Sequence, residues 1–122
     1  MRANLIIEIV GSPKEHVENV IKEMVQKIQN EKKVLKYNIF EAQQKEKLFF
    51  SFTEMEIDFN TFQELTGFCL DYFPSSIELL DDKINVKREE IENTLNDLLA
   101  KLHMYDMTVK NLKAELILRK NT

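Results

Sequence analysis

Apolar positions recur along the chain with two different periods, and these periods predict its elements. Residues 5–10 form an almost continuous apolar run rich in β-branched side chains, which is typical of a central β-strand. Residues 17–28 then carry apolar side chains at helical spacing, which predicts an amphipathic helix capped by Ser12, with Pro13 in its first turn, and ending near Asn30. Two strand-like runs, 34–41 and 47–59, follow on either side of the polar segment 42–46, the pattern of a β-hairpin.

The second strand of this hairpin changes the parity of its apolar positions. Three aromatic or aliphatic side chains alternate on one face, and three more continue on the opposite parity. The two sets are Leu48, Phe50 and Phe52, and then Met55, Ile57 and Phe59. One extra residue in a strand moves the following side chains to the other face, so the pattern predicts a bulge or bend near Thr53.

A second amphipathic helix is predicted from Asn60, as its N-cap, to the residues before Pro74, and residues 75–80 suit a short fourth strand. The resulting order is β-α-β-β-α-β. Two right-handed β-α-β crossovers satisfy this order best in a four-stranded antiparallel sheet with both helices on one face. The sequence therefore predicts an α+β, ferredoxin-like domain over residues 1–82.

Residues 83–122 show a different pattern, in which eight apolar side chains follow at alternating spacings of four and three. They are Ile91, Leu95, Leu98, Leu102, Tyr105, Val109, Leu112 and Leu116. No glycine or proline interrupts this heptad pattern, so it predicts one long helix from about Lys87 to Arg119 with a coiled-coil seam. At about 1.5 Å per residue the helix extends roughly 50 Å, which is longer than a small domain is wide. We therefore expect much of the seam to need a partner outside its own domain.

The charges beside the seam permit pairing with an identical helix. In a parallel pair, Lys87 would face Glu92 and Lys101 would face Asp106, and both pairs are opposite in sign. An antiparallel pair is also acceptable, because it would bring Glu92 near Lys113. We expect a homo-oligomer, with a parallel dimer slightly favoured, while a helix folded back on its own sheet remains the alternative.

Composition narrows the class of protein further. The 122 residues are 43% hydrophobic and 31% charged, with only two glycines and two prolines, as in a folded globular chain. A net charge of -4 disfavours nucleic acid or an anionic membrane as the main partner. The single cysteine, Cys69, cannot form an internal disulfide, and no signal or membrane-spanning segment is evident, so we expect a cytoplasmic protein.

Candidate chemistry is sparse. Glu54, Glu56 and Asp58 alternate along the predicted third strand, where three carboxylates in a row suit an oxygen-seeking cation, but a solvated strand end is the favoured explanation. His16 and His103 are far apart in sequence, and no acid, base and nucleophile can be placed together. We therefore predict no catalytic residues, no metal and no cofactor.

Two features resemble known families. Gly11, in the turn between the first strand and helix, resembles the glycine that helps ACT domains bind amino acids, and this resemblance implies small-molecule sensing. Residues 47–52 (Lys-Leu-Phe-Phe-Ser-Phe) resemble the third-strand motif of RNA-recognition modules, which stack bases on exposed aromatics. That motif's glycine is missing here, and the first strand has no aromatic residue.

The sheet face away from the helices is the second predicted contact surface. We place Ile6 and Phe49 on it, together with Glu8, which would repel phosphate. The sequence as a whole therefore predicts a non-enzymatic interaction or scaffold module that self-associates through its C-terminal helix. An ACT-like regulatory domain and a single-stranded RNA binder are the alternatives.

Overall fold

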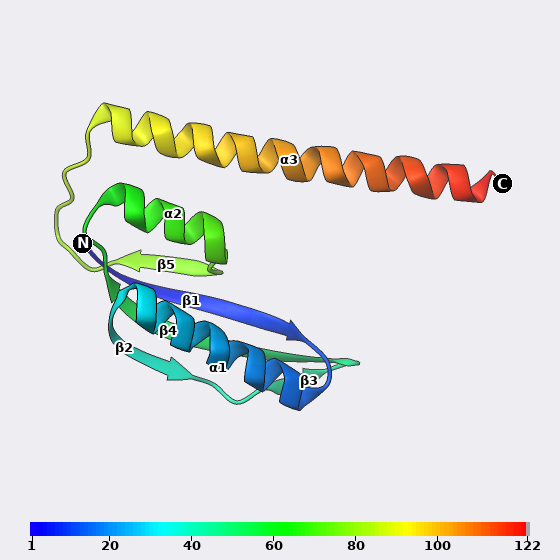
Figure 1. The fold of residues 1–122 in the computed structure, drawn as a ribbon, viewed down its shortest axis with the longest axis horizontal. Coiled ribbons are helices and arrows are strands. Elements are labelled where there is room, and N and C mark those ends of the chain that lie inside the picture. The colour runs from blue at the N-terminus through cyan, green and yellow to red at the C-terminus, as the bar shows by residue number, and fades with distance from the viewer. Residues whose placement is uncertain (122) are drawn as a thin grey trace. The chain divides into compact units, whose positions relative to one another are not determined.

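The computed structural model describes residues 1–121, which divide into two units (Figure 1). The first unit, Met1–Asn85, is an α+β domain. The second unit begins at Val86 and consists of helix α3, Arg88–Lys120. Its 33 residues correspond to a length of about 50 Å. The prediction of one uninterrupted C-terminal helix is confirmed.

The α+β unit contains five strands and two helices. Its elements are β1 Arg2–Gly11, α1 Lys14–Glu31, β2 Lys33–Ile39, β3 Gln43–Lys45, β4 Leu48–Asp58, α2 Phe62–Tyr72 and β5 Ser76–Leu79. The strands are antiparallel in the order β2-β4-β1-β5, with the short β3 pairing with the start of β4. The two most apolar strands, β1 and β4, are central, as in the ferredoxin-like arrangement. The predicted fold class is therefore confirmed, with β3 as an addition.

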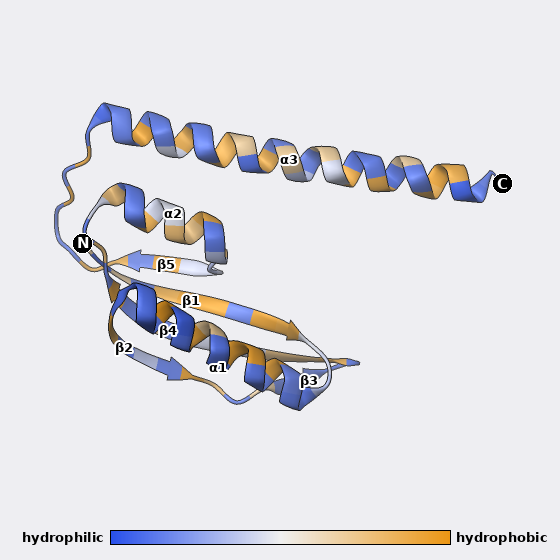
Figure 2. Ribbon diagram, in the orientation of Figure 1, coloured by the Kyte–Doolittle hydropathy of each residue, from blue (hydrophilic) through white to orange (hydrophobic). Residues whose placement is uncertain are grey.

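Both helices cover the same face of the sheet. A single core cluster joins the alternating side chains of β1 and β4 to the apolar stripes of α1 and α2. Its buried members are Ala3, Leu5, Ile7, Val25, Ile28, Met55, Ile57, Phe59, Leu65 and Phe68. Figure 2 shows the matching hydropathy, with an almost continuously apolar β1 beside the amphipathic α1. The pleat sends every second residue of β1 and β4 to the opposite face.

The predicted bulge near Thr53 is wrong. Pairing between β1 and β4 runs without interruption from Arg2 opposite Asp58 to Gly11 opposite Phe49. The helix-covered face of β4 stays in register, but two of its residues are polar, Ser51 and Thr53, and both are fully buried. Their hydroxyls replace apolar side chains in the alternation, which produces an apparent change of parity.

These two hydroxyls are satisfied by the neighbouring chain segment. Ser51 Oγ donates a hydrogen bond to the carbonyl of Phe40 at 2.7 Å, and Thr53 Oγ1 donates one to Asn38 at 2.9 Å. A buried hydroxyl is tolerated when it is hydrogen-bonded. The register shift that the sheet does contain lies in β2, between Val34 and Lys36.

Both helix starts are displaced from the predicted caps. The N-cap position of α1 is Pro13, not Ser12, and no side-chain hydrogen bond caps this end. The N-cap of α2 is Thr61, one residue after the predicted Asn60, and Thr61 Oγ1 accepts a hydrogen bond from Glu64 N at 3.0 Å. The backbone N–H of Asn60 donates to Glu64 Oε2 at 2.9 Å, so the two groups cap this turn reciprocally.

Candidate functional site

The eight heptad positions of α3, called the seam below, form the strongest candidate surface. None of the residues of α3 is buried. All eight seam side chains are exposed, from 39% for Leu98 to 56% for Leu116. Figure 2 shows apolar patches recurring along the helix. An a/d stripe of this kind is the surface that a second helix covers in a coiled coil.

Charged residues stabilise α3 within its own chain. Arg88 Nη1 lies 2.6 Å from Glu92 Oε1, and Lys110 Nζ lies 2.8 Å from Asp106 Oδ2, both at the i,i+4 spacing. Such exposed pairs contribute about 0.3–0.5 kcal/mol each. Glu92 and Asp106 are also the acidic residues expected to face a parallel partner, so an interhelical contact would share carboxylates that already have an intrahelical partner.

Sequence reasoning missed a second set of apolar side chains on α3. Five exposed residues lie outside the seam positions, most of them in the C-terminal half of the helix. They are Leu99, Met104, Met107, Ile117 and Leu118. A helix with apolar residues on more than one side favours more than one contact. The heptad count overlooked them because it followed only the a and d positions.

The open face of the sheet, defined as the face opposite α1 and α2, carries apolar side chains at one end. Ile6 lies there as predicted, and the register adds Val10, Phe50 and Phe52. The rings of Phe40 and Phe52 stack with centroids 4.3 Å apart. Phe49 was predicted on this face, and that prediction is wrong, because Phe49 pairs with Gly11 on the helix-covered side.

The other end of the open face is polar. Glu54, Glu56 and Asp58 share this face as expected, but each carboxylate faces a nitrogen donor. Asn4 Nδ2 donates to Glu54 Oε1 at 2.8 Å, and Lys36 Nζ lies 3.9 Å from Glu56 Oε1. These contacts hold the three carboxylates apart along the strand, so the carboxylates do not converge on one point.

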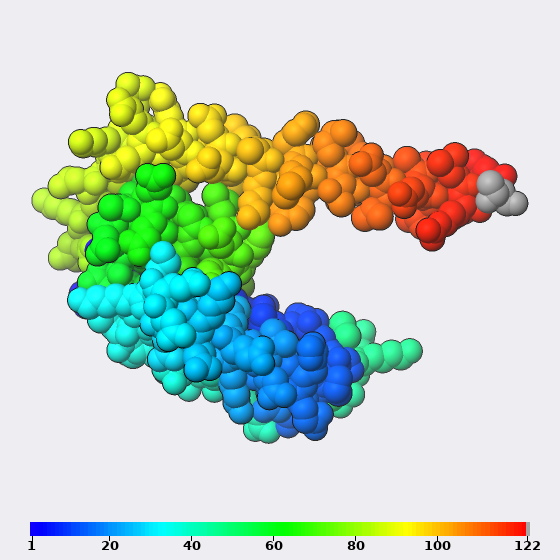
Figure 3. All heavy atoms as spheres, viewed as in Figure 1, coloured from blue at the N-terminus to red at the C-terminus, as the bar shows by residue number. Residues whose placement is uncertain are grey.

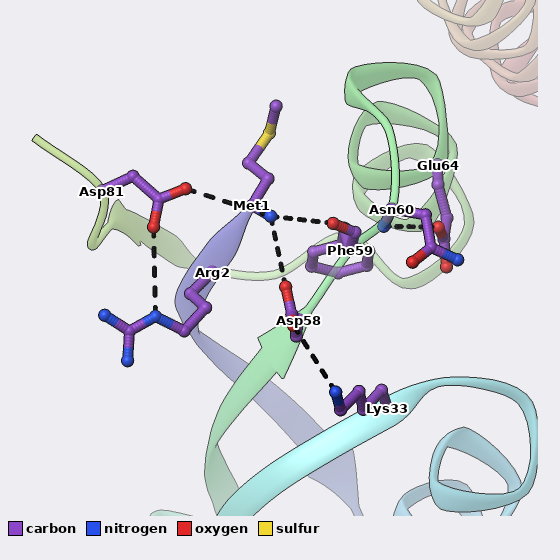
Figure 4. Close-up of polar contacts among 8 residues, drawn as sticks. All are labelled: Met1, Arg2, Lys33, Asp58, Phe59, Asn60, Glu64 and Asp81. Atoms are coloured by element: carbon purple, nitrogen blue, oxygen red, sulfur yellow. Dashed lines mark hydrogen bonds and ion pairs between the residues drawn. The ribbon is translucent and has the colours of Figure 1, made fainter. Parts of the chain in front are cut away.

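Asp58 lies in a denser cluster, drawn in Figure 4. Its Oδ1 is 3.1 Å from the Met1 amino group, and its Oδ2 is 3.8 Å from Lys33 Nζ. Asp81 approaches the same amino group at 3.9 Å and Arg2 Nε at 3.9 Å. This network of ion pairs joins the end of β4 to the start of β1 and to the segment after β5. These contacts indicate a structural role for the network.

Other candidate groups are dispersed. In residues 1–121, no three His, Cys, Asp or Glu side chains come close enough to hold a metal ion. His16 lies on α1 and His103 on α3. Cys69 is partly buried on α2, and burial raises the pKa of its thiol, which disfavours the reactive thiolate. No helix in the described part of the chain is long and apolar enough to cross a membrane.

The turn at Gly11 is closely packed against α1. A Cβ added to Gly11 would lie 3.4 Å from Val17 Cγ2, at the tight end of ordinary contact. Lys14 Nζ, at the start of α1, lies 2.9 Å from Glu41 Oε1. This pair raises the pKa of Lys14 and lowers that of Glu41, mainly through their hydrogen bond. A Cβ at this distance makes ordinary van der Waals contact, so packing alone does not require a glycine in this turn.

Comparison with known proteins gives one assignment. A family model, described as the MJ0538 family, matches residues 2–120. The chain belongs to the MJ0538 family. The match spans the elements of the α+β unit and all of α3. No curated protein and no solved structure matched.

Proposed function

We propose that this MJ0538-family protein is a non-enzymatic interaction or scaffold module that self-associates through the seam of α3. In this proposal two copies pair their helices as a coiled coil, each carrying an α+β domain. The observation that carries the proposal is the set of eight heptad-spaced apolar side chains, all exposed, on a helix without a buried residue.

The gain from covering the seam supports self-association. Fully burying a large aliphatic side chain contributes about 1.5–3 kcal/mol, so covering a half-exposed one contributes about 1 kcal/mol. Bringing two chains together has an entropic cost of about 4–15 kcal/mol. The summed free energy of covering eight positions on each of two helices would exceed the middle of that range. Most helical stability in proteins comes from packing of an apolar face, so pairing would also stabilise the helix itself.

Light scattering on the full chain tests the proposal. We expect a mass twice the 14.5 kDa of one chain at micromolar concentration. A mass of one chain throughout the concentration range would refute self-association. A larger multiple would keep the proposal and would indicate that the second apolar set on α3 also takes part.

Helix orientation can be tested with one engineered cysteine. Arg119 continues the d positions of the seam near the end of α3, and in a parallel pair it would lie beside its own copy. In a Cys69→Ser background, we expect Arg119→Cys to form an interchain disulfide on mild oxidation. An antiparallel pair would separate the two thiols by nearly the whole helix, and no disulfide would form. Gel mobility without reductant distinguishes the two arrangements.

A further inference from the structure

A groove of about 390 Å³ lies between the C-terminal half of α1 and helix α2. Figure 3 shows the surfaces of these two segments, cyan and green, next to each other. The volume of the groove falls in the range of small-molecule sites, about 300–1,000 Å³. All the lining residues belong to the α+β unit. The groove therefore does not depend on α3.

The charges of the groove leave a negative balance. Lys32 Nζ and Glu64 Oε1 are 3.3 Å apart and neutralise each other. The remaining charged side chains are Lys27 on one wall and the carboxylates Glu31 and Asp71. Two carboxylates against one ammonium favour a ligand that brings a positive charge.

Two aromatic rings line the groove together with these carboxylates. The rings of Phe68 and Tyr72 have centroids 4.6 Å apart, and the Tyr72 hydroxyl donates a long hydrogen bond, 3.5 Å, to Glu31 Oε2. The pKa of Tyr72 is raised by burial first and then by the negative charges of Glu31 and Asp71. Both carboxylates thus act on the same phenol. An aromatic ring beside carboxylates is a favourable environment for an organic cation.

Gly67 keeps the groove open. It lies inside α2, where a glycine costs about 1 kcal/mol relative to alanine. A Cβ added there would meet no described atom within 4 Å, so packing within the described chain does not require a glycine. Gly67 lines the groove, and a side chain at this position would reduce the space available to a ligand.

We propose that this groove binds the primary ammonium group of a small organic amine. The ammonium group would lie between Glu31 and Asp71, with its alkyl chain over the ring of Tyr72. Simple alkylamines and cationic amino acids share this chemistry. An amino acid would add a carboxylate, which Lys27 is placed to contact. This site goes beyond the self-association proposed for α3 and is tested separately.

Amide NMR titration tests the site, because the chain has only two glycines. Gly67 reports on the groove, and Gly11, at the far end of β1, is an internal control. With 1,4-diaminobutane at constant ionic strength, we expect saturable shifts of the Gly67 amide and no change at Gly11. Equal shifts at both glycines, or shifts that rise linearly without saturation, would overturn the proposal.

Two variants establish which groups bind. We expect Asp71→Asn to weaken binding at least tenfold, while Asp82→Asn, an exposed carboxylate outside the groove, leaves it unchanged. Gly67→Leu fills open space and should abolish binding without unfolding the domain, which circular dichroism would check. Wild-type affinity in both groove variants would refute the site.

The source of the amine is decided by a second titration with L-lysine. Tighter binding of L-lysine than of 1,4-diaminobutane, lost in Lys27→Gln, would assign the site to cationic amino acids. Equal affinities, insensitive to Lys27→Gln, would assign it to simple alkylamines. Both outcomes support an ammonium site, whereas no response to either probe at millimolar concentration would overturn it.

Discussion

Replacing Leu98 and Leu102 with lysine should separate the proposed oligomer into single chains. These residues are neighbours on the seam, one turn apart near the middle of α3, and are 39% and 54% exposed. In a paired helix both would be covered. Lysine at these positions would place two charges of the same sign in the contact of each chain, where burial of an unpaired charge is unfavourable.

The expected magnitude follows from these exposures. Covering the exposed half of each leucine contributes about 1 kcal/mol, about half of the value for complete burial. Two residues in each of two chains give about 4 kcal/mol for the dimer. Since 1.4 kcal/mol corresponds to a factor of ten, the dissociation constant should rise about a thousandfold before charge repulsion is added. A micromolar dimer would therefore dissociate completely at ordinary concentrations.

Sedimentation equilibrium or light scattering would measure the change. A matched control, Asn96→Lys with His103→Lys, adds two lysines at exposed α3 positions outside the seam and should keep the wild-type mass. The amide NMR spectrum of the α+β unit should be nearly unchanged in both variants. Dissociation of the control, or an intact oligomer in the seam variant, would refute the assignment of the seam. Loss of all folded signals would show that α3 belongs to the core of the domain.

Two stability changes test the account of the α+β unit. Gly67→Ala should raise the free energy of unfolding by about 0.5–1 kcal/mol, because alanine has the higher helix propensity and the added methyl group meets open space. A lower free energy of unfolding, measured by chemical denaturation, would contradict that geometry. Thr53→Val should lower it by about 1 kcal/mol, because the carbonyl of Asn38 loses its donor in a buried site, and an unchanged midpoint would show that water replaces the hydroxyl.

The larger elements could be predicted because their signals are local. Helical spacing identifies α1 and α3, and β-branched runs identify β1. The short β3, Gln43–Lys45, carries no such signal, since all three residues are polar and exposed. Its pairing with the start of β4 depends on the path of the chain after β2. The sequence therefore predicted a loop where the sheet has an additional short strand.

The position of Phe49 was wrong for a different reason. Reading strand parity from apolar residues assumes that buried positions are apolar, whereas β4 buries the hydroxyls of Ser51 and Thr53. Those hydroxyls are satisfied by carbonyls of residues 38 and 40, a contact between strands that no local pattern contains. As a result the aromatics that β4 places on the open face are Phe50 and Phe52, and the resemblance to an RNA-recognition motif loses the residue on which it relied.

The groove shows the converse case, because the sequence contains an indication of this site that its hydrophobic pattern alone does not reveal. Glu31 and Asp71 come from different helices, so the proximity of Glu31 to Tyr72 requires the fold. Gly67, however, is a visible anomaly, because a helix interior disfavours glycine and the flanking pattern continues through it. Local preferences that disagree with the structure are expected at functional positions. A helix glycine is therefore a stronger indication of a binding surface than the turn glycine Gly11, because glycine is common in turns and costs stability inside a helix.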